Sequence, residues 1–442
     1  MKIQAKENPR IMNNDSRSSQ AQPASQTMTG QQWRVIVLCW LVNILDGFDL
    51  LAISFAAPAI AKSWRLDPQT LGIVFSSGLL GMTVGSLVFG PLADRIGRRR
   101  MILLAAGILG LSTLTTAMAS GIGQLMLLRG MTGIAIGALL PSLNTLVAEY
   151  TPDRKRNLAI SFMHLGYPVG GIGGGALAGY VIPASGWQAL FLIGGAFTLA
   201  MLPILLFGLP ESPRYLTRGR QWTTAENIAR HPRAIRAHCA HAGPNDFMNV
   251  LRWPWLMPGL ALWCCFFLGN LTLYFLLNWT PTILVDAGLS TAQAMRAGML
   301  LNMGGGIGML TLGYLSTRWS LRGMMSGYFI LGALFIMMLG QMQRLPETLP
   351  GLVPLVGFFS LGGLIGLYAL AARLYPDVMR ATGVGLAIGA GRFGAILGPY
   401  AGGLLMSLGW PMGEYFILLS LPLVIAAGVL WRIRGPEHSG AT

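Results

Sequence analysis

Two carboxylates lie in the middle of the first long apolar run, between about residues 35 and 61. Asp46 and Asp49 are three residues apart, so on a helix they share one face. Gly47, between them, leaves room for another helix or a ligand to approach closely. A run of this length can cross a bilayer, and an acidic side chain near its centre costs about 2.5–3.5 kcal/mol on insertion scales. The pair therefore predicts a polar cavity that handles protons or a substrate. The alternative is a buried polar pair that only fixes helix packing.

Two arginines are also predicted at membrane depth. Arg392 stands about twelve residues into the apolar run 380–407. A guanidinium at that depth is costly unless it meets an anion. Because arginine binds a carboxylate through two parallel hydrogen bonds, Arg392 suits the recognition of an organic acid. A permanent ion pair with Asp46 or Asp49 is the alternative. Arg129, about two turns inside its own apolar run, needs a partner or a cavity for the same reason.

The composition places these residues in an integral membrane protein. The chain has 442 residues, of which 53% are hydrophobic and 11% are charged, whereas soluble domains carry about 25% charged residues. The formal net charge is +15, with lysine and arginine in short stretches between apolar runs. That pattern is typical of cytoplasmic loops and speaks against a nucleic-acid partner. The sequence contains no metal-ligand spacing, nucleotide-binding loop or hydrolytic triad, so we expect neither an enzyme nor a cofactor.

The chain contains twelve apolar runs that are long enough to cross a bilayer as helices. If both termini are cytoplasmic, most arginines fall on the cytoplasmic side, as the positive-inside rule requires. We therefore predict an all-α membrane protein with twelve transmembrane helices in two six-helix halves. The predicted segments are a disordered cytoplasmic tail (1–32), an N-terminal bundle (33–209), a cytoplasmic linker (210–253), a C-terminal bundle (254–433) and a second cytoplasmic tail (434–442). The predicted helices are about 33–61, 70–92, 99–119, 122–149, 155–182, 187–209, 254–285, 292–317, 322–343, 349–373, 380–407 and 410–432.

The two halves resemble each other at an offset of 223–224 residues. The aligned positions are 90–99 with 313–322, 149–156 with 373–380, and Gly170 and Gly174 with Gly394 and Gly398. Transporters built from such repeats usually hold their substrate near the midplane, where the repeats meet. Asn270 lies opposite Asp46, so the second half has no acidic counterpart and ion handling is expected in the first half. The glycine-rich stretch 166–175 lacks the Lys-Ser/Thr ending of a phosphate loop and is expected to be a closely packed helix.

The loop between the second and third runs reads Gly90-Pro-Leu-Ala-Asp94-Arg95-Ile-Gly97-Arg98-Arg99. It resembles the signature loop of the major facilitator superfamily, and Glu149 resembles the acidic residue that pairs with the arginines of that loop. The alternatives are a basic loop that only sets topology and a solvated Glu149. The corresponding loop of the second half is altered, with Thr317 at the position of Asp94 and Ser320 in place of a glycine. The predicted residues of a cytoplasmic gate are Gly90, Asp94, Arg95, Gly97, Arg98, Arg99, Glu149 and Arg380.

The segment Asp46-Gly47-Phe48-Asp49 narrows the resemblance to the aromatic acid:proton symporter family. The stretches 380–385 (Arg-Ala-Thr-Gly-Val-Gly) and 391–394 (Gly-Arg-Phe-Gly) are also similar to the eleventh helix of that family. The resemblance covers nearly all of the chain after residue 33. It implies a major facilitator fold in the bacterial inner membrane. It also implies rocker-switch import of a small organic acid anion, most simply benzoate or a hydroxybenzoate, by proton symport.

On this resemblance we expect Asp46 and Asp49 to couple protons. The expected substrate contacts are Arg392, Arg129, Phe48, Tyr167, Asn270, Tyr274 and Phe393, and each aromatic ring among them could equally be ordinary packing. Further polar groups at membrane depth are His164, Asn43, Asn144, Asn278 and Asn302. The partners are the organic acid, protons and the lipid bilayer, and the protein is expected to be a monomer. The rival hypotheses are proton-coupled efflux of drugs or metabolites, a membrane sensor for aromatic acids, and a sugar transporter.

Overall fold

The computed structural model describes residues 28–152, 155–213, 215–216, 250, 255–316, 318–341, 349–376 and 379–433. Within these residues the secondary structure is helical, which confirms the predicted all-α class. The elements are α1 (Gly30–Trp64), α2 (Pro68–Ile96), α3 (Arg98–Thr116), α4 (Ile122–Tyr150), α5 (Arg156–His164), α6 (Gly166–Gly208), α11 (Leu256–Asp286), α12 (Thr291–Leu315), α13 (Leu321–Gln341), α14 (Leu349–Leu374), α15 (Arg380–Ser407) and α16 (Met412–Arg432). The predicted tails and linker lie mostly outside the described residues.

The fifth and sixth predicted spans appear as α5 and the long element α6. Gly186 has a left-handed backbone (φ 81°) and turns α6 back on itself, so that α5 with the first arm of α6 makes one pass and the second arm makes another. With this turn counted, the described helices provide the twelve predicted passes. By length and hydropathy alone, eight helical stretches of the described chain could span a membrane. Helices α3, α12 and α15 are not among these stretches.

Local sequence signals set where the first helices begin. Thr29 and Gln32 form a reciprocal capping box at the start of α1, which satisfies two backbone N–H groups that a helix start leaves unpaired. Asp67 accepts hydrogen bonds from Thr70 and caps α2, whose first residue is Pro68. These hydrogen bonds, chiefly the one from the Thr70 hydroxyl, lower the pKa of Asp67. The capping signals explain why α1 begins at Gly30, inside the predicted tail.

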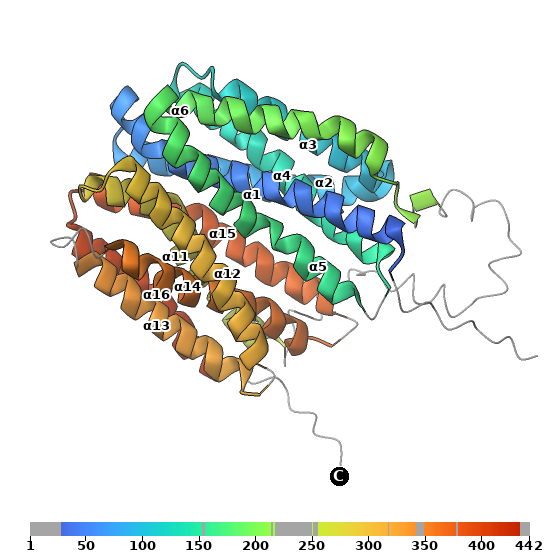
Figure 1. The fold of residues 1–442 in the computed structure, drawn as a ribbon. Helices are drawn as coiled ribbons and strands as arrows, with labels where there is room; N and C mark the ends of the chain where they lie inside the picture. The colour runs from blue at the N-terminus through green and yellow to red at the C-terminus, as the bar shows by residue number, and fades with distance from the viewer. Residues whose placement is uncertain are drawn as a thin grey trace, which may run out of the picture.

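The two halves use the same packing pairs. In the first half α1 packs on α6, α2 on α4 and α3 on α6; in the second half α11 packs on α15, α12 on α14 and α13 on α16. Figure 1 shows helices α1 to α6 as one group and helices α11 to α16 as the other. The aligned glycines Gly170 and Gly394 each allow a close approach to a neighbouring helix. A Cβ on Gly170 would lie 2.0 Å from the carbonyl oxygen of Ile44, and a Cβ on Gly394 would lie 2.0 Å from that of Phe267. The predicted pseudo-symmetry is therefore present in the packing.

The two groups are joined at one end of the molecule, where α2 begins and α15 ends. A Cβ on Gly403 would lie 2.4 Å from the carbonyl oxygen of Pro68. Ser76 Oγ donates to the carbonyl oxygen of Ile396 at 2.7 Å, and a Cβ on Gly72 would lie 2.8 Å from that of Pro399. The other end carries the α2–α3 loop with Arg95 and Arg98–Arg100, and we call it the basic end. The contacts described here close the molecule at the end opposite to it.

Candidate functional site

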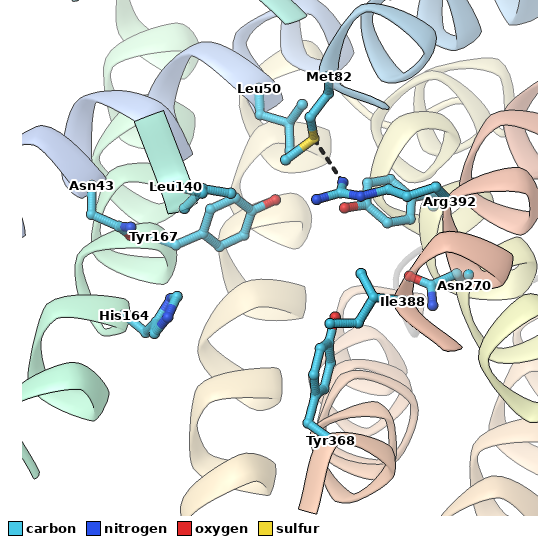
Figure 2. Close-up of a pocket in the computed structure, with 12 residues that line it drawn as sticks. Asn43, Leu50, Met82, Leu140, His164, Tyr167, Asn270, Tyr368, Ile388 and Arg392 are labelled. Atoms are coloured by element: carbon cyan, nitrogen blue, oxygen red, sulfur yellow. Dashed lines mark hydrogen bonds between the residues drawn. The ribbon is translucent and has the colours of Figure 1, made fainter. Parts of the chain in front are cut away.

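A cavity of about 160 Å³ lies between the two groups of helices. It is smaller than the sites of about 300–1,000 Å³ that hold drug-sized ligands, so its size suits a small solute. Its polar lining groups are Asn43, His164, Asn270 and Arg392, and its aromatic ones are Tyr167, Tyr274 and Tyr368. Leu50, Met82, Leu140 and Ile388 supply aliphatic surface (Figure 2). Both halves contribute, as expected of a binding site where two repeats meet.

The cavity extends toward the basic end. His164, the last residue of α5, is exposed, and Tyr368, close to the end of α14, is 40% exposed. Both side chains line the cavity, and Figure 2 shows them on its two sides. In the part of the chain that the structure describes, the contacts of α2 with α15 close the opposite end, and the cavity opens toward the basic end.

Arg392 is the cation of this cavity. It is half-buried on α15, and its Nη1 lies 2.9 Å from Met82 Sδ on α2. Among the described residues no carboxylate lies within ion-pair distance of its guanidinium. The alternative of a permanent ion pair with Asp46 or Asp49 is therefore not present in this structure. A thioether sulfur is a weak acceptor, so the guanidinium retains most of its capacity to bind an anion.

Close helix contact brings Tyr167 to the cavity. A Cβ on Gly47 would lie 2.2 Å from the carbonyl oxygen of Tyr167, and a Cβ on Gly166 would lie 2.7 Å from that of Trp40. Only glycine permits α1 and α6 to approach this closely. The space expected beside Gly47 is thus occupied by a helix, and the Tyr167 ring emerges from that helix into the cavity.

Asp46 lies beside the cavity but does not line it. It is 1% exposed, and its neighbours at one turn on either side, Asn43 and Leu50, are lining residues. Neither of its carboxylate oxygens has a hydrogen-bond partner in the described part of the chain. Its charge interacts with those of Asp49 and Arg392. An isolated ionised carboxylate is costly in such surroundings, so this site favours a protonated Asp46 or one that faces a cation.

Asp49 and Arg129 form a separate group with a small cavity of about 20 Å³ of its own. Thr113 Oγ1 donates to Asp49 Oδ1 at 2.6 Å, and Arg129 Nη2 donates to Thr116 Oγ1 at 2.6 Å. The Arg129 guanidinium also lies 5.0 Å from the centre of the Phe191 ring. The negative charge of Asp49 and the positive charge of Arg129 attract each other within this group. Arg129, predicted to contact the substrate, therefore does not line the larger cavity in this structure, and its charge interacts with that of Asp49.

Two predicted aromatic contacts also lie elsewhere. The Phe48 ring is buried against α6, 2.1 Å from the position that a Cβ on Gly194 would take and 3.0 Å from that of Gly174. Phe393 is 64% exposed on the outer surface of α15. It follows Arg392 by one residue, and a helix turns by 100° over that step, so the two side chains leave the helix on different faces. Tyr167, Asn270 and Tyr274, by contrast, do line the cavity.

The signature loop forms an ion-pair cluster around Arg98. Its guanidinium binds Asp94 Oδ1 at 2.9 Å and Glu149 Oε1 at 2.7 Å. Ser212 Oγ accepts from Arg98 Nη1 at 2.8 Å and donates to Glu149 Oε2. Arg95 is exposed beside this cluster. The predicted pairing of Glu149 with the loop is thus made through Arg98, and the alternative of a solvated Glu149 does not apply, because its side chain is 3% exposed.

A second acid, Glu211, holds the start of α3. Its Oε1 accepts from the backbone N–H of Arg99 at 3.0 Å, and its carboxylate lies against Gly97, whose φ of 101° suits only glycine. Tyr150 Oη donates to the carbonyl oxygen of Glu211 at 2.8 Å. Gly90, also among the predicted gate residues, has open space beside it. The side chain of Arg380 and all of Thr317 lie outside the described residues.

Among the residues of these sites that sequence reasoning missed are Glu211, Ser212, Met82 and Tyr368. Glu211 and Ser212 fall in the predicted linker. The acidic residue at the start of this arginine-rich segment could have indicated a partner for the basic α2–α3 loop. Met82 and Tyr368 sit in apolar runs with nothing in their surroundings to distinguish them. Their roles depend on which face of the helix points inward.

Comparison with known proteins identifies the family. The sequence pattern of the Major Facilitator Superfamily matches residues 39–342 and 299–442. The chain is 36% identical to the 4-hydroxybenzoate transporter PcaK of Pseudomonas aeruginosa, over 92% of this chain and 93% of that protein. It is 35% identical to the gallate transporter of Pseudomonas putida, over 91% and 92%. It is 31% identical to the benzoate transport protein of Acinetobacter baylyi, over 90% and 88%. The predicted resemblance is therefore confirmed.

Solved structures agree on the fold. A bacterial homologue of the human lysosomal transporter Spinster, inward-facing and unoccupied, superposes with a TM-score of 0.73 at 17% identity, over 92% of this chain and 98% of that one. A D-xylose-proton symporter gives a TM-score of 0.72 at 17% identity, over 93% of this chain and 99% of that one. The chain belongs to the Major Facilitator Superfamily and is a multi-pass transporter of the bacterial inner membrane, not an enzyme.

Proposed function

We propose that this transporter imports a small aromatic carboxylate, of the benzoate or hydroxybenzoate class, together with protons. The observation that carries the proposal is Arg392, a cation without an anionic partner among the described residues, in a small cavity walled by three tyrosines. A carboxylate binds guanidinium through two charge-assisted hydrogen bonds, which are about twice as strong as neutral ones. It therefore replaces the Met82 sulfur with a net gain. The substrates named for the relatives are of the same chemical class.

In the proposed orientation the basic end is cytoplasmic, in accord with the positive-inside rule, and both termini are inside. The structure then represents an inward-facing state. Rocker-switch exchange requires the contacts of α2 with α15 to part and the basic end to close. The Arg98 cluster, with Glu149 and Ser212, belongs to the first half alone. It keeps the α2–α3 loop and the end of α4 together as one rigid piece during that movement.

The proton site in this proposal is Asp46, with Asp49 in a supporting role. Asp46 is buried without a hydrogen-bond partner in the described chain and interacts with the charge of Arg392. Protonation of Asp46 removes an unfavourable buried charge, and it leaves Arg392 available for the substrate carboxylate. Asp49 is balanced by Arg129 and held by Thr113, so it stabilises the neighbourhood instead of exchanging its proton freely.

The charges set the driving force. One proton balances the charge of one carboxylate, so a one-to-one pair crosses without net charge and accumulates along the pH gradient. Each further proton adds about 2.3 kcal/mol per 100 mV of membrane potential. The dependence of accumulation on pH and on potential thus reports the stoichiometry.

The test is uptake of labelled benzoates, hydroxybenzoates, phenylpropionates and dicarboxylates into cells with and without the gene. We expect accumulation of aromatic monocarboxylates that an uncoupler abolishes. Lower internal substrate with the gene present would indicate efflux by antiport, and binding without accumulation would indicate a sensor. Arg392→Met, which keeps length and apolar bulk but removes the charge, is expected to abolish uptake while the protein still reaches the membrane.

A further inference from the structure

Asn43 is a buried amide without a hydrogen-bond partner in the described residues. It is 0% exposed and lines the cavity, yet neither its Nδ2 nor its Oδ1 is bonded. About 90% or more of buried polar groups in native proteins have a partner, so an exception at a binding cavity asks for an explanation. Leaving such a group unpaired costs stability. The position of Asn43 on α1, one turn before Asp46, puts this cost at the proposed site.

Four other asparagines, whose side chains the structure describes, do not share this property. Asn270, Asn278 and Asn302 each donate from Nδ2 to the carbonyl oxygen four residues earlier, at 2.8 to 3.0 Å. Asn144 Oδ1 is bonded to the imidazole of His164 at 2.9 Å. Asn43 makes no such bond, although the carbonyl group of residue 39 precedes it on the same helix. Its amide therefore keeps its hydrogen-bonding capacity at the wall of the cavity.

Packing limits where this amide can go. A Cβ on Gly166 would lie 3.0 Å from the Cβ of Asn43, so the stem of the side chain is enclosed by the start of α6. Arg392 comes from the other half of the molecule, and Figure 2 shows Asn43 and Arg392 on opposite sides of the cavity, with Tyr167 between them. A substrate with its carboxylate at Arg392 and its ring beside Tyr167 directs the far edge of the ring toward Asn43.

We infer that Asn43 recognises a ring hydroxyl at the end of the substrate distant from the carboxylate. The inference rests on the proposed function and deepens it, because it names hydroxylated aromatic acids as the preferred class. An amide supplies both a donor and an acceptor, so it can accept the hydroxyl hydrogen and donate to the hydroxyl oxygen. A site built to bond a hydroxyl rejects the analogue without it, because the polar group of the protein is then left unpaired.

The test compares uptake efficiency, kcat/KM, for 4-hydroxybenzoate, 2-hydroxybenzoate and benzoate. In the wild type we expect 4-hydroxybenzoate to exceed benzoate by about tenfold or more, whereas 2-hydroxybenzoate, whose hydroxyl lies beside the carboxylate, should resemble benzoate. Asn43→Leu removes both hydrogen-bonding groups at similar volume, and Asn43→Ala does so without a risk of overpacking. Both variants should bring the ratio of 4-hydroxybenzoate to benzoate close to one.

Asn302→Leu is the matched control, because Asn302 is also buried with an unpaired Oδ1 but does not line the cavity. It should leave the ratio unchanged, whatever it does to the amount of protein in the membrane. A ratio that stays the same in both Asn43 variants, or a wild type that does not favour 4-hydroxybenzoate, would overturn the inference while leaving aromatic acid import intact. Failure of the wild type to take up any aromatic acid would refute the proposed function itself.

Discussion

Substitution of Gly47 by alanine is the most direct test of how the cavity is positioned. The added Cβ would lie 2.2 Å from the carbonyl oxygen and 2.8 Å from the Cα of Tyr167, both backbone atoms of α6. Carbon–oxygen contacts between helices are about 3.3–3.6 Å long, so α1 and α6 must separate by roughly 1 Å at this point. Overpacking of this kind costs about 1–3 kcal/mol. The same displacement moves Tyr167 away from Arg392, and an error of about 1 Å at a reacting site can reduce rates by about 10²-fold.

We therefore expect Gly47→Ala to reduce initial uptake of the transported acid at least about tenfold and to lower the Tm of the purified protein. Gly173→Ala is the matched control: it adds the same methyl group to the glycine-rich stretch, at a position with open space beside it. Uptake is normalised to the amount of transporter in the membrane. Normal uptake and normal Tm in Gly47→Ala would refute the reasoning, as would equal damage from Gly173→Ala, because alanine would then be harmful irrespective of the contact.

Three further substitutions test the charged groups. Asp46→Asn should abolish accumulation against a gradient but permit exchange of labelled for unlabelled substrate. The neutral amide keeps the shape of the side chain but cannot carry a proton. Accumulation equal to that of the wild type would show that Asp46 does not couple protons to transport. Arg392→Lys keeps the charge but loses the bidentate geometry. KM should therefore rise about tenfold, which corresponds to a loss of roughly 1.4 kcal/mol of binding free energy. An unchanged KM would argue against carboxylate binding at Arg392. Arg98→Gln removes the ion pair of Arg98 with the buried Glu149 side chain, and breaking a buried pair costs about 3–5 kcal/mol. It should lower Tm far more than Arg95→Gln, whose side chain is exposed. Equal effects would show that the cluster has no structural role.

The fold could be predicted almost entirely from the sequence. In lipid, backbone groups must be satisfied within each segment, so every apolar run of sufficient length is a helix. The predicted and observed limits of α4 differ by one residue, and those of α15 are identical. The internal repeat was likewise readable, because Gly170 and Gly394 serve the same close contact in the two halves. The turn at Gly186 also falls between the predicted runs 155–182 and 187–209.

The charged residues of the site could also be recognised in the sequence. A carboxylate or guanidinium at membrane depth is energetically costly unless it has a partner or a polar cavity, so such a residue is a functional candidate. Their grouping was decided by the tertiary structure. Arg129 joins Asp49 and not the cavity, and Arg98, not Arg95, binds Glu149. The grouping of these charged residues depends on which helices pack against each other. The sequence of a single helix does not indicate its packing partners.

The sequence by itself determined the membrane class, the helical spans, the repeat and the presence of buried charges. Only the tertiary structure decided which residues meet in the cavity. A helix with lipid on one side and protein on the other is apolar on both, so its pattern does not mark the inward face. Phe393 and Tyr167 are both aromatic residues next to motif positions, yet the first faces outward and the second lines the cavity, because glycine contacts fix the rotation of each helix.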